Sequence, residues 1–228
     1  MLTKKKKLTR RVMKEDPLIK SVSKAKSFYE ENQTRIFIGL GVVAAIVLIF
    51  FIYRGSVEEN NIKAATELAK VMPLYEQGNY QEAINGIPGT DVLGLKKIAD
   101  EYSGSENGEA AKIYLANSYS FTGDIDKAMQ YYSDYSGSNP LFEATALAGA
   151  AGCNETKKEY KKAADLFLEA ANISEHNPLN PEYLFYASVN YIEVKEIEKA
   201  KELLEKIKKD YPSSYYLSQV EKYLTLVN

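Results

Sequence analysis

The residues that most often carry out catalysis are scarce in this chain of 228 residues. Its single histidine, His176, stands beside an Asn-Pro pair between two helical patterns, where a loop residue is expected. Its single cysteine, Cys153, lies among glycines and alanines of a predicted helix and is expected to be a small buried side chain. A Ser-His-Asp triad would have to be built on the His176 connector. One cysteine can form neither an internal disulfide nor a multi-cysteine metal site.

Other sites of chemistry are also missing from the sequence. It contains neither GxGxxG nor GxxxxGK(S/T), the glycine-rich loops that cradle nucleotide phosphates. The neighbouring carboxylates Asp124 and Asp126 fall at a predicted turn, where an acidic side chain caps a helix. We therefore predict no catalytic, cofactor-binding or metal-binding residues, and a protein that is not an enzyme.

Charge is distributed unevenly along the chain. Residues 1–35 carry a net charge of +7, residues 36–53 carry none, and residues 54–228 carry a net charge of −9. An acidic body of this size repels phosphate, which argues against a nucleic-acid partner. A soluble cytosolic domain has no reason to contain an uncharged stretch of this length.

The uncharged stretch has the sequence IFIGLGVVAAIVLIFFIY at 36–53. As a helix it would be roughly 27 Å long, close to the thickness of the hydrocarbon core of a bilayer. Arg35 and Arg54 flank it and can reach the headgroups. A cleaved signal peptide is the alternative, but its apolar run would be shorter and a small-x-small cleavage site would follow. The sequence therefore predicts a transmembrane helix, in which Gly41 and Ala45 form a small-residue pair that could seat another helix.

Basic residues are concentrated before this predicted helix. By the positive-inside rule, we expect residues 1–35 to be cytoplasmic and residues 54–228 to lie on the other side of the membrane. The dense basic run from Lys4 to Arg11 predicts attraction to anionic lipid. A short amphipathic helix is expected after Asp16-Pro17. Its apolar face would consist of Leu18, Val22, Ala25 and Tyr29.

A repeated helical pattern fills the rest of the chain. Ala128, Ala163 and Ala200 stand 35 and 37 residues apart, and each follows a short turn and opens the second helix of a predicted pair. Ala83 takes the same place in an earlier copy. Small residues here let the two helices approach closely, and stacked pairs share a core that no single pair could form. The predicted fold is all-α: an N-terminal transmembrane helix, an α-solenoid of about three to four helix pairs, and a C-terminal capping helix.

The pattern divides the chain into four segments. These are a basic tail with a short amphipathic helix at 1–35, the transmembrane helix at 36–53, a linker helix with a degenerate first repeat at 54–107, and regular repeats with the capping helix at 108–228. In the degenerate repeat, Ile87-Pro88-Gly89 is expected to end the second helix early. The helical pattern restarts at Leu95.

The regular copies resemble the tetratricopeptide repeat (TPR). The resemblance covers residues 108–212 as three units. It implies a scaffold that binds other proteins, because the fold itself carries no chemistry. The clearest copy has small, aromatic and turn residues at Leu115, Ala116, Tyr119, Gly123, Ala128, Tyr132 and Pro140.

The whole layout is similar to the YfgM-like family, as is the segment KAKSFYEENQTR that precedes the apolar stretch. This resemblance implies a bacterial inner-membrane subunit with a periplasmic domain, attached to the Sec translocon and linked to periplasmic chaperones. The implied partners are translocon subunits or a membrane-bound chaperone. Two other roles stay open: a scaffold for envelope assembly or cell division, and a membrane-bound regulator that signals through its cytoplasmic tail.

Repeat geometry predicts which residues line the groove formed by the first helices of the pairs. This groove lacks Lys and Arg, so it does not resemble the TPR surfaces that clamp a C-terminal carboxylate. An apolar segment or a partner helix is the expected ligand. The predicted partner-binding residues are Ile113, Asn117, Ser120, Phe121, Thr145, Ala148, Phe185, Val189 and Ile192.

Overall fold

The computed structural model describes residues 17–227. The basic run from Lys4 to Arg11, with its predicted attraction to anionic lipid, lies outside these residues. The chain divides into two compact units, one that ends at Gly55 and one that begins at Ser56. Regular structure in the described range is helical, apart from an isolated bridge between Gly86 and Leu93. The all-α class predicted from the sequence is confirmed.

The first unit consists of a helix that continues into the second. Helix α2 (Pro17–Glu76) runs for 60 residues without a break. Its first residue is a proline, which is tolerated there because the N–H that proline lacks would have no partner in the first turn of a helix. The predicted amphipathic, transmembrane and linker helices are all part of α2, because no proline occurs between Pro17 and Pro73.

The apolar stretch 36–53 lies within α2. An 18-residue window of this helix has a mean hydropathy of 2.9, so the helix is long and apolar enough to cross a membrane by length and composition. Gly41 and Ala45 are both exposed. Nothing lies within 4 Å of a Cβ atom placed on Gly41, so this small-residue position is open to contact from outside the unit.

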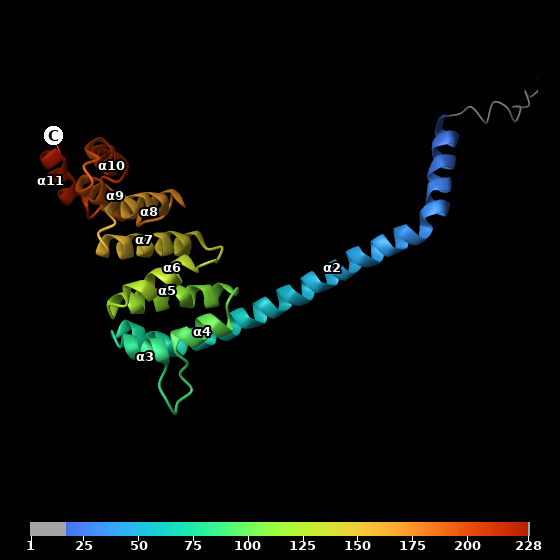
Figure 1. The fold of residues 1–228 in the computed structure, drawn as a ribbon, viewed down its shortest axis with the longest axis horizontal. Helices are drawn as coiled ribbons and strands as arrows, with labels where there is room; N and C mark the ends of the chain where they lie inside the picture. The colour runs from blue at the N-terminus through green and yellow to red at the C-terminus, as the bar shows by residue number, and fades with distance from the viewer. Residues whose placement is uncertain (1–16, 228) are drawn as a thin grey trace, which may run out of the picture. The chain divides into compact units, whose positions relative to one another are not determined.

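The second unit is a stack of helix pairs (Figure 1). The end of α2 and the short α3 (Tyr80–Asn85) form the first, irregular pair, followed by α4 (Leu95–Glu101). Three regular pairs and a final helix follow: α5 (Glu106–Phe121) with α6 (Ile125–Ser133), α7 (Pro140–Thr156) with α8 (Tyr160–Asn172), α9 (Asn180–Glu193) with α10 (Ile197–Asp210), and α11 (Leu217–Val227). We call the first helix of each pair its A helix and the second its B helix.

The alanines of the repeat pattern lie where the A and B helices cross. Ala83, Ala128, Ala163 and Ala200 are all fully buried, with an exposed fraction of 0%. A larger side chain there would push the two helices apart. The predicted repeat spacing therefore marks positions that are completely buried in the solenoid.

The first repeat is interrupted as the sequence predicted. Helix α3 ends at Asn85, a hairpin-like loop follows and projects from the stack in Figure 1, and α4 begins at Leu95. Glycines hold the base of this loop closed: a Cβ atom on Gly94 would lie 2.3 Å from the carbonyl oxygen of Ile84. The loop is therefore anchored by direct backbone contact, which only glycine permits.

Each A helix is joined to its B helix by the same left-handed turn. The residues with positive φ in these turns are Gly78 (78°), Gly123 (85°), Lys158 (61°) and Lys195 (61°). The N–H of the following residue bonds back into the A helix, as from Asp124 to the carbonyl of Tyr119 at 2.9 Å. This bond satisfies a carbonyl at the end of the A helix. In two repeats a lysine occupies the position that glycine fills in the others.

The left-handed lysines generate a stability prediction. Lys158→Gly and Lys195→Gly should each stabilise the fold by about 0.5–1 kcal/mol, because glycine avoids the clash of Cβ with the backbone at positive φ. This change corresponds to a rise of about 2–4 °C in the Tm per kcal/mol, measurable by circular dichroism on the full-length protein in detergent. Lys206→Gly, at an exposed position inside α10, should instead destabilise by about 1 kcal/mol. Equal effects at the three positions would contradict the prediction.

Candidate functional site

The residues first considered for catalysis lie apart from one another and have structural roles. His176 is exposed in the turn before α9, and Cys153 is buried in α7 with 2% of its surface exposed. Burial raises the pKa of the Cys153 thiol, which disfavours the reactive thiolate. Asp124 caps α6 by accepting a hydrogen bond from the N–H of Lys127. Within residues 17–227 no three His, Cys, Asp or Glu side chains are grouped so that they could hold a metal ion.

The surface formed by the A helices is the remaining candidate. Successive A helices touch one another through it: Tyr75 at the end of α2 contacts Tyr114 of α5 with ring centroids 5.3 Å apart, and Tyr114 contacts Phe142 of α7 at 6.4 Å. We define the A-helix face by a set of side chains on the A helices. They are Tyr75 and Glu76 of α2; Tyr114, Asn117, Ser120 and Phe121 of α5; Thr145, Ala148, Gly152 and Glu155 of α7; and Glu182, Tyr186, Val189, Ile192 and Glu193 of α9.

Aromatic rings form a continuous row at the start of this face. Phe121 stacks on Tyr80 of α3 with centroids 4.6 Å apart, and Tyr80 meets Tyr75 edge-on at 5.7 Å. The row continues through Tyr114 to Phe142. Phe121 keeps 63% of its surface exposed, which is unusual for a phenylalanine in a packed domain. The row therefore ends in an apolar ring that is free to contact another molecule.

Asn117 holds the helices beneath this row together. Its amide nitrogen donates to the hydroxyl oxygen of Tyr75 at 3.1 Å, and its amide oxygen accepts from the hydroxyl of Tyr132 on α6. Burial raises the pKa of Tyr132, so the tyrosine remains a neutral donor. Both ends of the Asn117 amide are thus used inside the protein, and its role is to position the aromatic rings.

The nine residues predicted to line the groove are not equally available. Phe121 is exposed, and six others are half-buried: Asn117, Ser120, Thr145, Ala148, Val189 and Ile192. Ile113 and Phe185 are instead buried, with exposed fractions of 2% and 4%. Ile113 belongs to the core around α5. Phe185 is covered by the ring of Tyr216, just before α11, and by the ring of Tyr223 within α11. These two residues therefore stabilise the solenoid rather than line an open surface.

Sequence reasoning missed the tyrosines of the A-helix face. Tyr114 and Tyr186 occupy the same position in their repeats, separated by the same interval as Ala128 and Ala200. That equal spacing was a usable signal. Tyr75 could not be found in this way, because alignment of Gly78 with Gly123 places Tyr75 opposite Ser120 and not opposite another tyrosine.

Glu109 of α5 is a buried carboxylate that holds two loops in place. Its oxygens accept hydrogen bonds from the N–H of Gly104 at 3.0 Å and of Ser136 at 2.9 Å, and Lys112 pairs with it at 2.7 Å. Burial alone would raise the pKa of Glu109, but the bonds from Lys112 and the two backbone groups outweigh it, so the pKa lies below its usual value. The group is therefore ionised and structural.

Comparison with known proteins adds one family. Residues 182–214 match the family model of the tetratricopeptide repeat, and this span contains most of α9 and all of α10. No curated protein matches the chain. The match, together with the three regular helix pairs, supports tetratricopeptide repeats in this chain and, with them, the class of protein-interaction scaffolds.

The Glu109 cluster predicts how stability depends on pH. Because its pKa is lowered in the folded state, its contribution is fully present above the ordinary glutamate pKa of about 4.3 and is lost as pH falls through the lowered value. Glu109→Gln should destabilise the protein at pH 7 by about 2 kcal/mol. It should also flatten the decline of the Tm below pH 5. The exposed Glu205→Gln should do neither, and an unchanged Tm for Glu109→Gln would show that the two loops are held by other contacts.

Proposed function

We propose that this protein is a membrane-anchored scaffold whose A-helix face binds segments of partner proteins. The observation that carries the proposal is the exposed ring of Phe121, which stands at the end of an aromatic row on the A-helix face. The tetratricopeptide match supports protein binding rather than catalysis.

The placement in the cell rests on charge and hydropathy. The apolar stretch of α2 spans the inner membrane of a bacterium, residues 1–35 face the cytoplasm, and the solenoid lies in the periplasm. The net charge of +7 before the stretch supports this orientation. The basic tail also attracts anionic lipid, and Gly41 and Ala45 offer a contact for a neighbouring transmembrane helix.

The role of the scaffold lies near the export channel. We infer that its partners are subunits of the Sec translocon or a membrane-bound periplasmic chaperone. The similarity of the whole layout to the YfgM-like family supports this assignment: a basic tail, one apolar helix and a helical-repeat domain of similar size. A protein at this place would hold partners beside newly exported chains.

The orientation can be tested with single cysteines. In a Cys153→Ala background, Ser218→Cys on α11 should react with a membrane-impermeant maleimide in intact spheroplasts. Ser23→Cys, near the start of α2, should react only after the membrane is permeabilised. Both serines are exposed, so access to the reagent decides the result. The opposite pattern would invert the proposed topology.

The partner-binding surface can be tested by photocrosslinking in cells. A photoreactive residue in place of Phe121 in the full-length protein should crosslink translocon subunits or a membrane-bound chaperone. Phe121→Ala should lower the recovery of the same partners several-fold in a mild-detergent pull-down. Leu226, a similarly exposed apolar residue on α11, is the matched control position. Recovery of wall-synthesis or outer-membrane proteins without the translocon would contradict the export role and favour an envelope-assembly scaffold.

A further inference from the structure

The A-helix face carries charge of one sign only. Its ionisable side chains, tyrosines aside, are Glu76, Glu155, Glu182 and Glu193, and none of its defining residues is a lysine, arginine or histidine. Glu76 and Glu193 are exposed, and Glu155 and Glu182 are half-buried. None of the four takes part in an ion pair within the described part of the chain. Their negative charge is therefore uncompensated.

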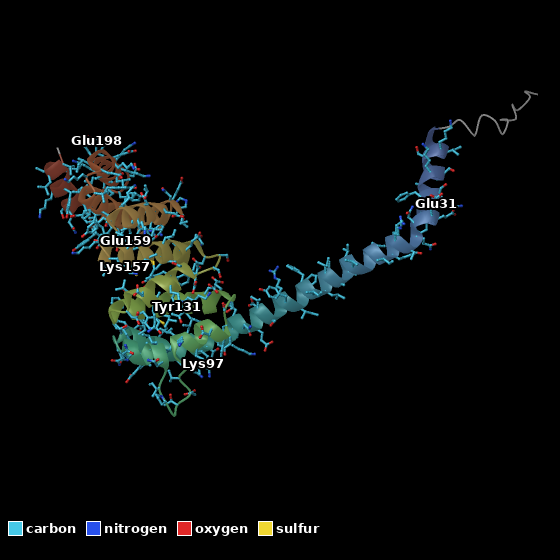
Figure 2. The ribbon with its side chains drawn as sticks, in the orientation of Figure 1. Glu31, Lys97, Tyr131, Lys157, Glu159 and Glu198 are labelled. Atoms are coloured by element: carbon cyan, nitrogen blue, oxygen red, sulfur yellow. The ribbon has the colours of Figure 1, made fainter. Side chains whose placement is uncertain are left out.

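Four lysines near the solenoid's turns do not supply the missing positive charge, because each is bound to a nearby carboxylate. Lys157 and Glu159, labelled in Figure 2 at the turn between α7 and α8, each take part in one of these pairs, with different partners. These ion pairs are Lys127–Asp124, Lys157–Asp126, Lys162–Glu159 and Lys199–Glu196, with distances of 2.5–2.6 Å. The charges of these four lysines are thus neutralised locally, and the unpaired carboxylates of the A-helix face remain. Lys158 and Lys195, exposed at the turns, take part in none of the ion pairs of the described residues.

Aromatic and apolar groups lie among these carboxylates. Phe121, Tyr75 and Tyr114 form the row at one end of the face, and Tyr186 stacks on Phe167 at the other with centroids 5.4 Å apart. Between them lie small or apolar side chains such as Ala148 and Val189. A ligand must therefore bury apolar surface against rings while it meets several negative charges.

We propose that the segment bound by the A-helix face is a cationic amphipathic stretch of a partner protein, with apolar residues interspersed with lysine or arginine. This inference rests on the proposed function of the face and adds the chemistry of its ligand. Apolar side chains of the segment pack on Phe121 and the tyrosines, while its cations pair with the free glutamates and with the faces of the rings. The net charge of −9 over residues 54–228 adds long-range attraction for such a segment and repels an acidic one.

The test uses full-length protein in an uncharged maltoside detergent and two synthetic amphipathic peptides. One peptide combines leucine and phenylalanine with lysine, and the other has glutamate in place of each lysine. Fluorescence anisotropy should show that the lysine peptide binds at least tenfold more tightly than the glutamate peptide. Its affinity should fall as salt is raised, because screening weakens exposed charge pairs. Any binding of peptide to micelles is common to all protein variants, so differences between variants report the protein.

A matched pair of triple variants locates the charge effect. Glu76→Gln, Glu155→Gln and Glu193→Gln together should weaken binding of the lysine peptide about tenfold. Glu198→Gln, Glu202→Gln and Glu205→Gln together change the net charge equally on α10, a B helix on which all three side chains are exposed, and should leave the affinity nearly unchanged. Equal effects of the two triples would show non-specific attraction and overturn the proposal.

A third variant separates this inference from the proposed function. Phe121→Ala should also weaken the binding of the lysine peptide, because the substitution removes the exposed apolar contact. Phe121→Ala could weaken the binding of both peptides equally while the charge of the peptide has no effect on affinity. In that case the face binds proteins but does not select cationic ones. If neither Phe121→Ala nor the A-helix triple changes the binding of either peptide, the face is not the binding surface and both proposals fail. Tighter binding of the glutamate peptide would also overturn the charge assignment.

Discussion

The solenoid depends on the close approach of the A and B helices at one small residue in each pair. Ala83, Ala128, Ala163 and Ala200 are completely buried at these crossings. An isolated helix pair has too little apolar surface to be stable, so each pair must also pack on the next. Two core clusters result, one around α5 and one around α9, and the partly buried Leu166 of α8 packs against both. The A-helix face exists because this stacking places equivalent helices side by side.

The left-handed turns show how much local strain the stacking tolerates. Two turns use glycine and two use lysine at the same φ, yet their backbone hydrogen bonds are alike, as in Glu159 to Asn154 at 2.8 Å and Asp124 to Tyr119 at 2.9 Å. The geometry is thus imposed by the helices on either side, and the residue type only adjusts its free energy. For this reason the repeat could be recognised from alanine spacing even where the turn lacked glycine.

The sequence predicts the solenoid better than its surface. The repeat interval indicated the three regular pairs, and Ile87-Pro88-Gly89 indicated the break after α3, because helix period, small residues and proline act locally. Phe185 was misplaced because its burial depends on Tyr216 and Tyr223, which lie in the capping segment and have no counterpart in the repeat pattern. The aromatic row was also hidden, since it joins Tyr80 of an irregular repeat to Phe121 of a regular one. Contacts between non-equivalent repeats cannot be derived from the pattern of one repeat.

The continuity of α2 has a consequence for how a partner would be found. Ala64 is the first buried apolar residue in the described chain, and it follows Tyr53, the last residue of the apolar stretch, by only eleven positions. Eleven residues span at most about 40 Å even when fully extended. With the stretch in a bilayer, the solenoid cannot leave the layer of water next to the lipid. Its search for partners then becomes diffusion in two dimensions, which favours proteins embedded in the same membrane over those free in solution.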